Sequence, residues 1–322
     1  MTREWLEQRQ VLVYLACIAA GLFVGTSFPS LAERFEAILW PTLGLLLYAT
    51  FSQVPLVRLR DVALDRRFLV AAIVGNFLVL PLVAWGLSML APSDPAVHLG
   101  VLLVLLVPCT DWFITFTHVG GGDTRRAIAF TPVSLLLQLA LLPVYLSLFL
   151  GTDVAVGLVH RELLTAFFAL IALPLLLAFV TQTWAERGPR RQRVVTALAW
   201  LPVPLLAVVV FSIAAAQVGV VVASAGLLGH LLAIFVAFLL LAALLARVLA
   251  LVFALPPAQG RVLAFSLGSR NSFVVLPLAL ALPAPFELAI VVIVFQSMVE
   301  LCGMVAFVWL VPRRLFPTAH AG

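Results

Sequence analysis

The chain has 322 residues, of which 64% are hydrophobic and only 10% are charged, and its mean hydropathy is +1.20. Soluble domains carry roughly 25% charged residues, so this composition excludes a water-soluble globular protein and favours a lipid-embedded one. The formal net charge of +5 comes from arginine alone, since the sequence contains no lysine. We attribute this charge to membrane topology and expect no nucleic-acid partner.

Apolar runs long enough to cross a bilayer recur along the whole chain. A hydrocarbon core about 30 Å thick needs roughly 20 helical residues at a rise of 1.5 Å each. The first run begins near Val11 and lacks a signal-peptide cleavage site, so we interpret it as a span. Hydropathy therefore predicts an all-α polytopic membrane protein with about ten transmembrane helices. The predicted spans are residues 11–28, 36–55, 68–91, 97–119, 124–150, 163–183, 195–219, 227–254, 259–282 and 286–311.

Loop arginines divide unequally between the two sides of the membrane when alternate connections are assigned to opposite sides. Only Arg34 and Arg161 fall on the poorer side. The richer side is cytoplasmic by the positive-inside rule. An even number of spans then places both termini in the cytoplasm, and we expect a multi-pass protein of the cell inner (plasma) membrane. The richer side receives Arg3, Arg9, Arg58, Arg60, Arg66, Arg67, Arg125, Arg126, Arg187, Arg190, Arg191, Arg193, Arg261, Arg313 and Arg314.

Ten spans also divide into two sets of five, and an odd number of helices per repeat inverts the second copy. We predict a single membrane transporter domain over residues 1–322, with inverted repeats at approximately 11–151 and 160–311. Polar residues interrupt the fourth span at 108–111 and the ninth span at 266–272, and the spans that follow also carry polar residues, at 131–138 in the fifth and at 296–300 in the tenth. Interruptions at corresponding places in two halves indicate a substrate site near the midplane of the bilayer.

Few charged side chains lie inside the predicted spans, where each costs about 2.5–3.5 kcal/mol on insertion scales. Arg270 either binds substrate or pairs with Glu300 or Asp111 to hold two helices together. Asp111 and Glu300 are our candidates for ion coupling, whereas Arg247 and His118 lie near span ends. The predicted substrate-binding residues are Cys109, Thr110, Asp111, Ser269, Arg270, Asn271 and Ser272.

Cys109 differs from the other two cysteines in its surroundings. It follows the helix-breaking Pro108 and precedes Thr110, so its thiol could be a soft ligand for a thiophilic solute. The alternative is a small hydrophobic residue that only packs. Cys17 and Cys302 lack polar neighbours of this kind, and we interpret them as packing residues. We expect three free thiols and no disulfide, because the cysteines are few and scattered over apolar segments.

Motifs for enzymatic chemistry are missing from the sequence. It has no histidine and cysteine spacing typical of a metal site, no nucleophile elbow and no nucleotide-binding fingerprint. The glycines at 120–122 are best explained as a tight cytoplasmic turn. We therefore predict no enzymatic activity, no cofactor and no bound metal.

The motif Val107-Pro108-Cys109-Thr110-Asp111 resembles the Pro-Cys-Thr form of the fourth helix of arsenite-efflux permeases, and Gly122-Asp123 matches the Gly-Asp that closes that helix. On these motifs the chain resembles the superfamily of bile acid:sodium symporters and arsenical-resistance permeases. The resemblance implies a core domain in which the broken fourth and ninth helices cross at the membrane centre, and a panel domain that rocks against it. It also implies that Cys109 is required.

The ninth span departs from both branches of that superfamily. Sodium-coupled members carry a Glu-x-Gly-x-Gln-Asn pattern, whereas residues 266–271 here read Ser-Leu-Gly-Ser-Arg-Asn, so Arg270 stands where a sodium-binding amide is expected. Two like charges about 4 Å apart repel by several kcal/mol at an effective dielectric constant near 20, so we expect no sodium coupling. Arsenite permeases carry a glutamate after an Asn-Asn-Phe, but Val274 follows Phe273 here.

The sequence supports three hypotheses of function. The first is a sodium-independent, proton-linked secondary transporter of the arsenical-resistance type that exports arsenite or a related small oxyanion, with Cys109 contacting the solute and Asp111 or Glu300 carrying protons. The second keeps the fold and has Arg270 bind the carboxylate or sulfonate of an organic anion. The third is a membrane sensor without transport, which the lack of any sizeable soluble output domain disfavours.

Overall fold

The computed structural model describes residues 3–54, 65–110, 112–149, 165–219 and 225–317. These residues are nearly all helical, and each of the ten predicted spans contains a helix, which confirms the all-α prediction. The first half contains α1 (Arg3–Ser27), α2 (Ala32–Phe51), α3 (Arg66–Val74), η3 (Gly75–Val79), α4 (Leu80–Ser88), α5 (Pro95–Leu106), α6 (Trp112–Val119) and α7 (Thr124–Phe149). The second half contains η4 (Phe167–Ala172), α9 (Leu173–Ala185), α10 (Pro189–Leu198), α11 (Pro202–Ala216), α13 (Ala225–Val252), α14 (Pro257–Gly268), α15 (Ser272–Leu280), α16 (Leu288–Leu310) and η6 (Val311–Leu315).

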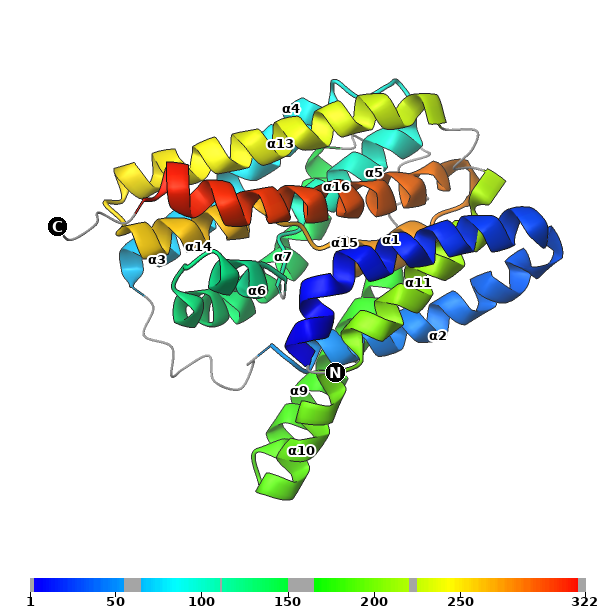
Figure 1. Ribbon diagram of the computed structural model, residues 1–322, viewed down its shortest axis with the longest axis horizontal. Coiled ribbons are helices and arrows are strands. Elements are labelled where there is room, and N and C mark those ends of the chain that lie inside the picture. The colour runs from blue at the N-terminus through cyan, green and yellow to red at the C-terminus, as the bar shows by residue number, and fades with distance from the viewer. Residues whose placement is uncertain (1–2, 55–64, 111, 150–164, 220–224, 318–322) are drawn as a thin grey trace.

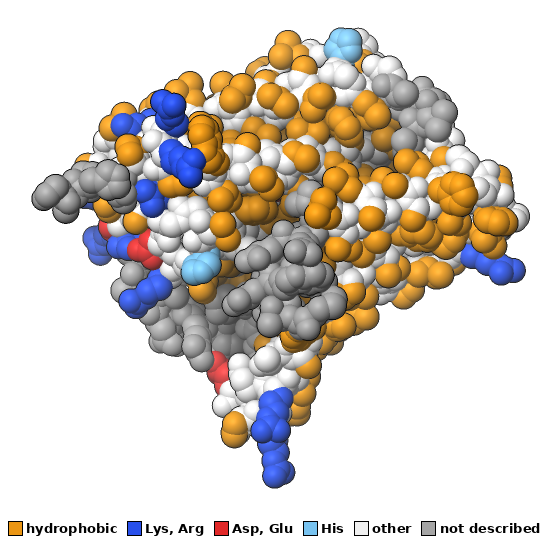
Figure 2. Space-filling view, in the orientation of Figure 1, with side chains coloured by type: hydrophobic (Ala, Val, Ile, Leu, Met, Phe, Trp, Pro, Cys, Tyr) orange, Lys and Arg blue, Asp and Glu red, His pale blue; other side chains and the backbone are white. Residues whose placement is uncertain are grey.

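The outer surface of the helices is suited to lipid. Five continuous helical segments among the described residues are long and apolar enough to cross a membrane, and shorter apolar helices accompany them. Large apolar side chains such as Leu82, Leu148 and Leu240 are more than 60% exposed. Figure 2 shows hydrophobic side chains spread widely over one face of the molecule, with arginines mainly at its left side and at its lower tip. The chain is therefore a multi-pass membrane protein.

The helices form two groups, which are visible in Figure 1. In the panel group, α1, α2, η4, α9, α10 and α11 pack mainly on one another. In the core group, α3 to α7 pack with α13 to α16. The principal contacts between the groups run through α15 with α2 and η4, and through α1 with α16. The contacts between the two groups are therefore fewer than those within either group.

Helix α10 was not predicted from the sequence. Arg190, Arg191 and Arg193 were expected in a loop, but they lie on this polar helix, which forms a hairpin with the end of α9. Pro189 lies at the start of α10. Proline is favoured there because the backbone N–H groups of the first helical turn have no partner within the helix, so the missing N–H of proline costs nothing. Arg191 lies over the Trp184 ring at 5.0 Å and joins the two arms of the hairpin.

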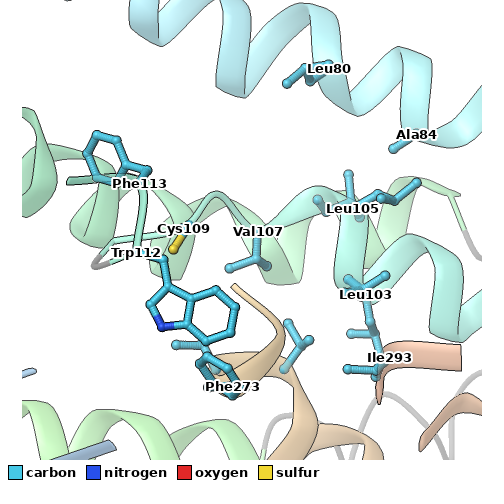
Figure 3. Close-up of a cluster of buried hydrophobic side chains, with 14 of the residues drawn as sticks. Leu80, Ala84, Leu103, Leu105, Val107, Cys109, Trp112, Phe113, Phe273 and Ile293 are labelled. Carbon is cyan, nitrogen blue, oxygen red and sulfur yellow. The ribbon is translucent and has the colours of Figure 1, made fainter. Parts of the chain in front are cut away.

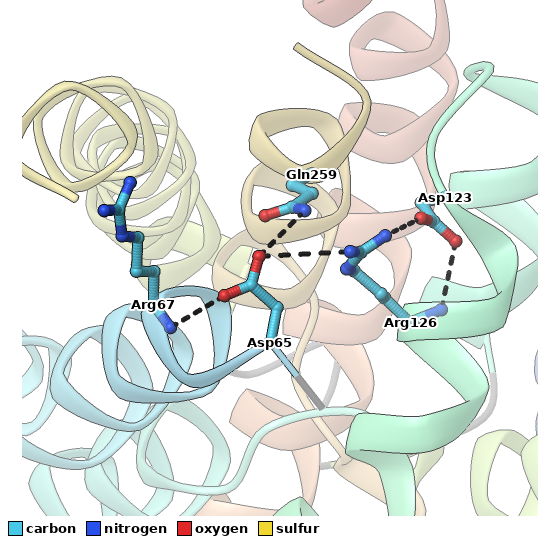
Figure 4. Close-up of polar contacts among 5 residues, drawn as sticks. All are labelled: Asp65, Arg67, Asp123, Arg126 and Gln259. Carbon is cyan, nitrogen blue, oxygen red and sulfur yellow. Dashed lines mark hydrogen bonds and ion pairs between the residues drawn. The ribbon is translucent and has the colours of Figure 1, made fainter. Parts of the chain in front are cut away.

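Polar residues from three helices meet at one end of the core group (Figure 4). Asp65 caps α3, accepting from the backbone N–H of Arg67 at 3.0 Å, and lies 3.9 Å from Arg126 of α7, which also pairs with Asp123. The side-chain nitrogen of Gln259 on α14 donates to the Asp65 carboxylate at 3.3 Å. With the amide in its flipped orientation, the Gln259 side-chain oxygen accepts from Arg126 at 3.0 Å. The bond from Arg67 lowers the pKa of Asp65, with Gln259 and Arg126 acting in the same direction. The starts of the predicted spans 68–91, 124–150 and 259–282 thus lie together at one end of the molecule. This arrangement is required if their arginines all face the same side of the membrane.

Tyr145 of α7 stabilises an irregular turn in the third span. Its hydroxyl donates to the backbone carbonyl of Phe77, which lies in the π-helical segment η3. π-Helical turns break the regular backbone hydrogen-bond pattern, and an unpaired carbonyl is costly where no water is present. The bond therefore ties α7 to the segment that carries Asn76.

We predict that Tyr145→Phe lowers the free energy of unfolding by about 1–3 kcal/mol, because it leaves a buried carbonyl without its donor. Tyr48→Phe is the matched comparison, since the Tyr48 hydroxyl lies 2.9 Å from that of Thr181, which can bond to its own helix instead. The thermal unfolding midpoint of the detergent-purified protein should fall more for Tyr145→Phe than for Tyr48→Phe. Equal changes would contradict this prediction.

Candidate functional site

Two broken helices cross at the centre of the core group. Between α5 and α6, and between α14 and α15, the backbone leaves the helical conformation, with Val107 and Ser269 extended. The Cys109 N–H donates to the Ser269 carbonyl at 3.1 Å, and the Asn271 N–H donates to the Val107 carbonyl at 2.7 Å. These bonds form a short antiparallel bridge between Pro108 and Arg270. The predicted crossing of the fourth and ninth spans is therefore confirmed, and it brings four half-helix ends together.

Cys109 lies at this crossing in an apolar setting. The residue is only 4% exposed, and Figure 3 shows its side chain next to Val107 and Trp112, with Phe273 beyond the Trp112 ring. The Trp112 and Phe273 rings pack edge to face with centroids 4.9 Å apart. A thiol in such surroundings is shielded from bulk water but remains next to the broken helix ends.

Thr110 and Asn271 form a polar pair beside Cys109. The Asn271 amide donates to the Thr110 hydroxyl at 3.1 Å, and its side-chain oxygen accepts from the Val274 N–H at 3.3 Å, which caps the start of α15. Both side chains are buried. Asp111, which we predicted as a substrate and coupling residue, lies outside the described residues.

Arg270 directs its guanidinium at the carboxyl ends of both half-helices. One terminal nitrogen, Nη2, donates to the carbonyls of Ser266 at 3.0 Å and Leu267 at 2.8 Å, and to Asn76 Oδ1 at 3.0 Å. The other, Nη1, donates to the Leu105 carbonyl at the end of α5 at 3.3 Å. The side chain is 2% exposed. The guanidinium thus neutralises the partial negative charge that helix carboxyl ends carry.

Aromatic packing completes the surroundings of this guanidinium. The ring of Phe238 on α13 lies 5.3 Å from its central carbon, a cation–π arrangement. Its remaining nitrogen, Nε, has no hydrogen-bond partner among the described residues. Arg270 is therefore held by groups from α5, η3, α13 and α14.

Glu300 lies on the opposite side of the ninth-span break. Its carboxylate accepts from the backbone N–H of Arg270 at 2.8 Å and from the Gln296 amide at 2.8 Å, and Gln296 in turn accepts from the Ser272 hydroxyl at 2.9 Å. Pairing of Arg270 with Glu300 or Asp111 was the alternative to substrate binding, and the hydrogen bond to Glu300 comes from the backbone N–H of Arg270. A carboxylate that accepts from a backbone N–H at a helix break can respond to movement of that break.

Polar residues of α7 face the interior without local partners. Ser134 and Gln138, one helical turn apart, are each 1% exposed, and their side-chain oxygens and nitrogen have no hydrogen-bond partner among the described residues. Thr131, on the same helix, instead bonds back to the Ala127 carbonyl at 2.9 Å. Buried polar groups without partners cost about 1–3 kcal/mol each, so these two residues suit contact with water or a polar solute.

The structure brings the predicted site residues together and adds residues that the sequence analysis missed. Cys109, Thr110, Ser269, Arg270, Asn271, Ser272 and Glu300 all lie at or next to the crossing. Asn76 and Phe238 were not predicted. A signal existed for Asn76, which is a polar residue following Gly75 within an apolar span, whereas Phe238 is one of many aromatic residues in the chain. Cys17 is half-buried and Cys302 is exposed, so only Cys17 packs as expected.

Comparison with known proteins agrees with this architecture. The sequence model described as the Sodium Bile acid symporter family matches residues 40–224, which is more than half of the chain and includes the first of the two broken helices. No curated protein matches the chain. Members of this family are transporters, which fits a multi-pass protein with two groups of helices and a broken-helix crossing. The chain belongs to the Sodium Bile acid symporter family.

Proposed function

We propose that this protein is a sodium-independent secondary transporter that exports arsenite or a related small oxyanion, with Cys109 as the residue that contacts the solute. The observation that carries the proposal is the position of Cys109 at the crossing of the two broken helices, where its backbone N–H bonds to Ser269. Transporter sites form at such breaks, where backbone and side-chain groups are available near the midplane. Thr110 and Asn271 supply hydroxyl and amide groups beside the thiol.

The chemistry of the site suits trivalent arsenic. A thiol can replace one hydroxyl of arsenous acid, forming a sulfur–arsenic bond while the displaced hydroxyl leaves with the thiol proton as water, and the reverse step releases the solute. Thiolates prefer soft acceptors, which hydroxyl oxygens do not. The remaining hydroxyls of the solute would bond to Thr110 and Asn271, the polar pair beside the thiol.

Proton linkage through Glu300 is part of the proposal. Its carboxylate accepts two hydrogen bonds at the ninth-span break, one from Arg270 and one from Gln296. Protonation of Glu300 would remove its negative charge and weaken the two hydrogen bonds that it accepts. Proton binding would thereby be coupled to the geometry of the crossing. Buried carboxylates in membrane spans commonly serve as proton relays.

A second candidate function is transport of an organic anion with an apolar body. An apolar cleft of about 530 Å³ lies between α7 and α9, lined by residues such as Leu139 and Phe179. Its position between the two groups would suit the apolar part of such a cargo. This second candidate is less well supported than the first, because it needs Arg270 to bind the anionic group of the cargo. The terminal nitrogens of Arg270 already donate to Leu105, Ser266, Leu267 and Asn76.

We predict that arsenite transport proceeds at the same rate when sodium is replaced by potassium or choline, because the Arg270 guanidinium already supplies a positive charge at the break. Proteoliposomes containing the purified protein, loaded with labelled arsenite or taurocholate, would test this under imposed sodium or proton gradients. Arsenite flux that responds to protons alone supports the proposal. A flux that scales with the sodium gradient contradicts sodium independence, and taurocholate transport without arsenite transport would favour the second candidate.

A further inference from the structure

We infer that the arginine-rich end of the core group holds a binding site for the phosphate headgroup of an anionic phospholipid, formed by Arg247 of α13 together with Arg313 and Arg314 of η6. The inference goes beyond the proposed function, because a bilayer lipid is neither the solute nor the coupling ion. Its starting point is an arginine that lies on the outer surface of a helix, among apolar side chains.

Arg247 is a charged residue on a surface that otherwise suits lipid acyl chains. It is exposed, and Leu244 and Leu251, three residues before and four residues after it, are 59% and 64% exposed. Residues at these spacings share one face of a helix. α13 contains no acidic residue, so the helix itself supplies no counter-charge. An arginine in this position extends its charged group toward the phosphates of the membrane surface, while its aliphatic stem stays among apolar groups.

The residues beneath Arg247 fix the position of its guanidinium. Its central carbon lies 5.5 Å from the centre of the Phe316 ring, a cation–π arrangement. Phe316 is 2% exposed, and its backbone carbonyl accepts from Arg261 Nε at 3.1 Å and from Arg261 Nη2 at 2.9 Å. Gly260 packs so closely on the same ring that any side chain at this position would collide with it. The platform under Arg247 is therefore already formed without a ligand, which lowers the entropy lost on binding.

Two further arginines lie beside this platform. Arg313 and Arg314 precede Phe316 in η6, which packs on α13, and both are exposed. The Arg313 guanidinium lies 5.3 Å from the centre of the Trp309 ring, and Trp309 is itself 52% exposed. Tryptophan is enriched at the membrane–water interface, so this ring indicates the level at which headgroups lie. Figure 2 shows arginines next to hydrophobic side chains at the left side of the molecule.

These three guanidinium groups have no carboxylate partner in the part of the chain that the structure describes. The ion pairs there are those of Arg126 with Asp65 and Asp123. A phosphate supplies the missing negative charge, and a guanidinium can donate two parallel hydrogen bonds to it. Basic pockets between transmembrane helices are suited to anionic headgroups. A phospholipid fits this site better than a free phosphate, because its acyl chains would cover the exposed leucines beside Arg247.

The test is native mass spectrometry of the full-length protein, released from detergent that contains equal amounts of phosphatidylglycerol and phosphatidylcholine with the same acyl chains. The wild-type protein should retain phosphatidylglycerol with a preference of about tenfold, and Arg247→Gln/Arg313→Gln should lose most of it, because charge-assisted hydrogen bonds to the phosphate are removed. Arg247→Lys keeps the charge without the paired donors and should lower the preference less than Arg247→Gln does. No solute is present, so the result does not depend on what the protein transports.

Arg190→Gln/Arg193→Gln is the matched control. It removes the same charge from two exposed positions of α10, a helix without buried residues and so without a platform of this kind. It should keep the wild-type preference for phosphatidylglycerol. The thermal unfolding midpoints of all variants in phosphatidylcholine alone should equal that of the wild type, since the substituted side chains are exposed.

The inference is overturned if the wild-type protein retains the two lipids equally, or if Arg190→Gln/Arg193→Gln lowers the preference as much as Arg247→Gln/Arg313→Gln does. It is also overturned if millimolar inorganic phosphate abolishes the preference, because the site would then bind free phosphate. Arsenite resistance is a separate measurement, so a variant that loses the lipid preference but confers resistance would leave the proposed function intact.

Discussion

Cys109→Ser is expected to abolish arsenite resistance in an arsenite-sensitive host. The serine keeps the size of the side chain and can keep the backbone bond from residue 109 to Ser269, so the crossing should survive. What is lost is the soft sulfur ligand, which a hydroxyl does not replace for trivalent arsenic. The measurement is growth at graded arsenite concentrations, with the amount of each variant checked in the membrane fraction.

The other cysteines provide matched controls. Cys17 is half-buried in the panel group, and Cys302 is exposed on α16. Cys17→Ser and Cys302→Ser should retain resistance, with at most modest losses from packing. Full resistance from a well-expressed Cys109→Ser would remove the thiol from the mechanism and leave the organic-anion candidate as the better one.

Glu300→Gln is expected to eliminate proton-driven accumulation of the solute while sparing downhill flux. A glutamine side-chain oxygen can still accept from the Arg270 N–H and from Gln296, so the break should keep its geometry. An amide does not take up and release a proton at physiological pH, so any coupling through this residue is lost. Arsenite uptake into inverted vesicles would be measured with and without an imposed proton gradient.

Glu287 offers the control for this variant, because it is an exposed carboxylate at the start of the same helix. Glu287→Gln should leave both accumulation and downhill flux unchanged. Proton-driven accumulation that persists in Glu300→Gln would assign coupling to another group, such as Asp111. Loss of downhill flux as well would show that Glu300 is needed for the movement of the crossing itself.

The spans and the two breaks could be predicted from the sequence because each depends on local properties. Apolar runs set the helices, and Pro108 and Gly268 mark the places where two of them are interrupted. The crossing itself came only from the resemblance, and the structure supplies its backbone bonds, such as that between Asn271 and Val107. Helix α10 was mistaken for a loop, because arginine density signals a side of the membrane but does not prevent a helix.

The direction of the Arg270 side chain could not be predicted. Its partners Asn76 and Leu105 lie 194 and 165 residues away in the sequence, and their proximity depends on how the two halves pack. Sequence reasoning offered substrate binding or pairing with Glu300, since both use charges that are visible in the sequence. Backbone carbonyls carry no such signal, because every residue has one.

The set of oxygens that accept hydrogen bonds from the Arg270 guanidinium also bears on how such proteins diversify. Three of its four oxygens belong to the main chain, so substitutions at Leu105, Ser266 or Leu267 can change the side chain without altering the ligand. Only Asn76 and Arg270 take part in these hydrogen bonds through their side chains. Relatives that share this device should therefore be recognisable by the joint presence of these two residues, and loss of the arginine should be accompanied by change at the asparagine position.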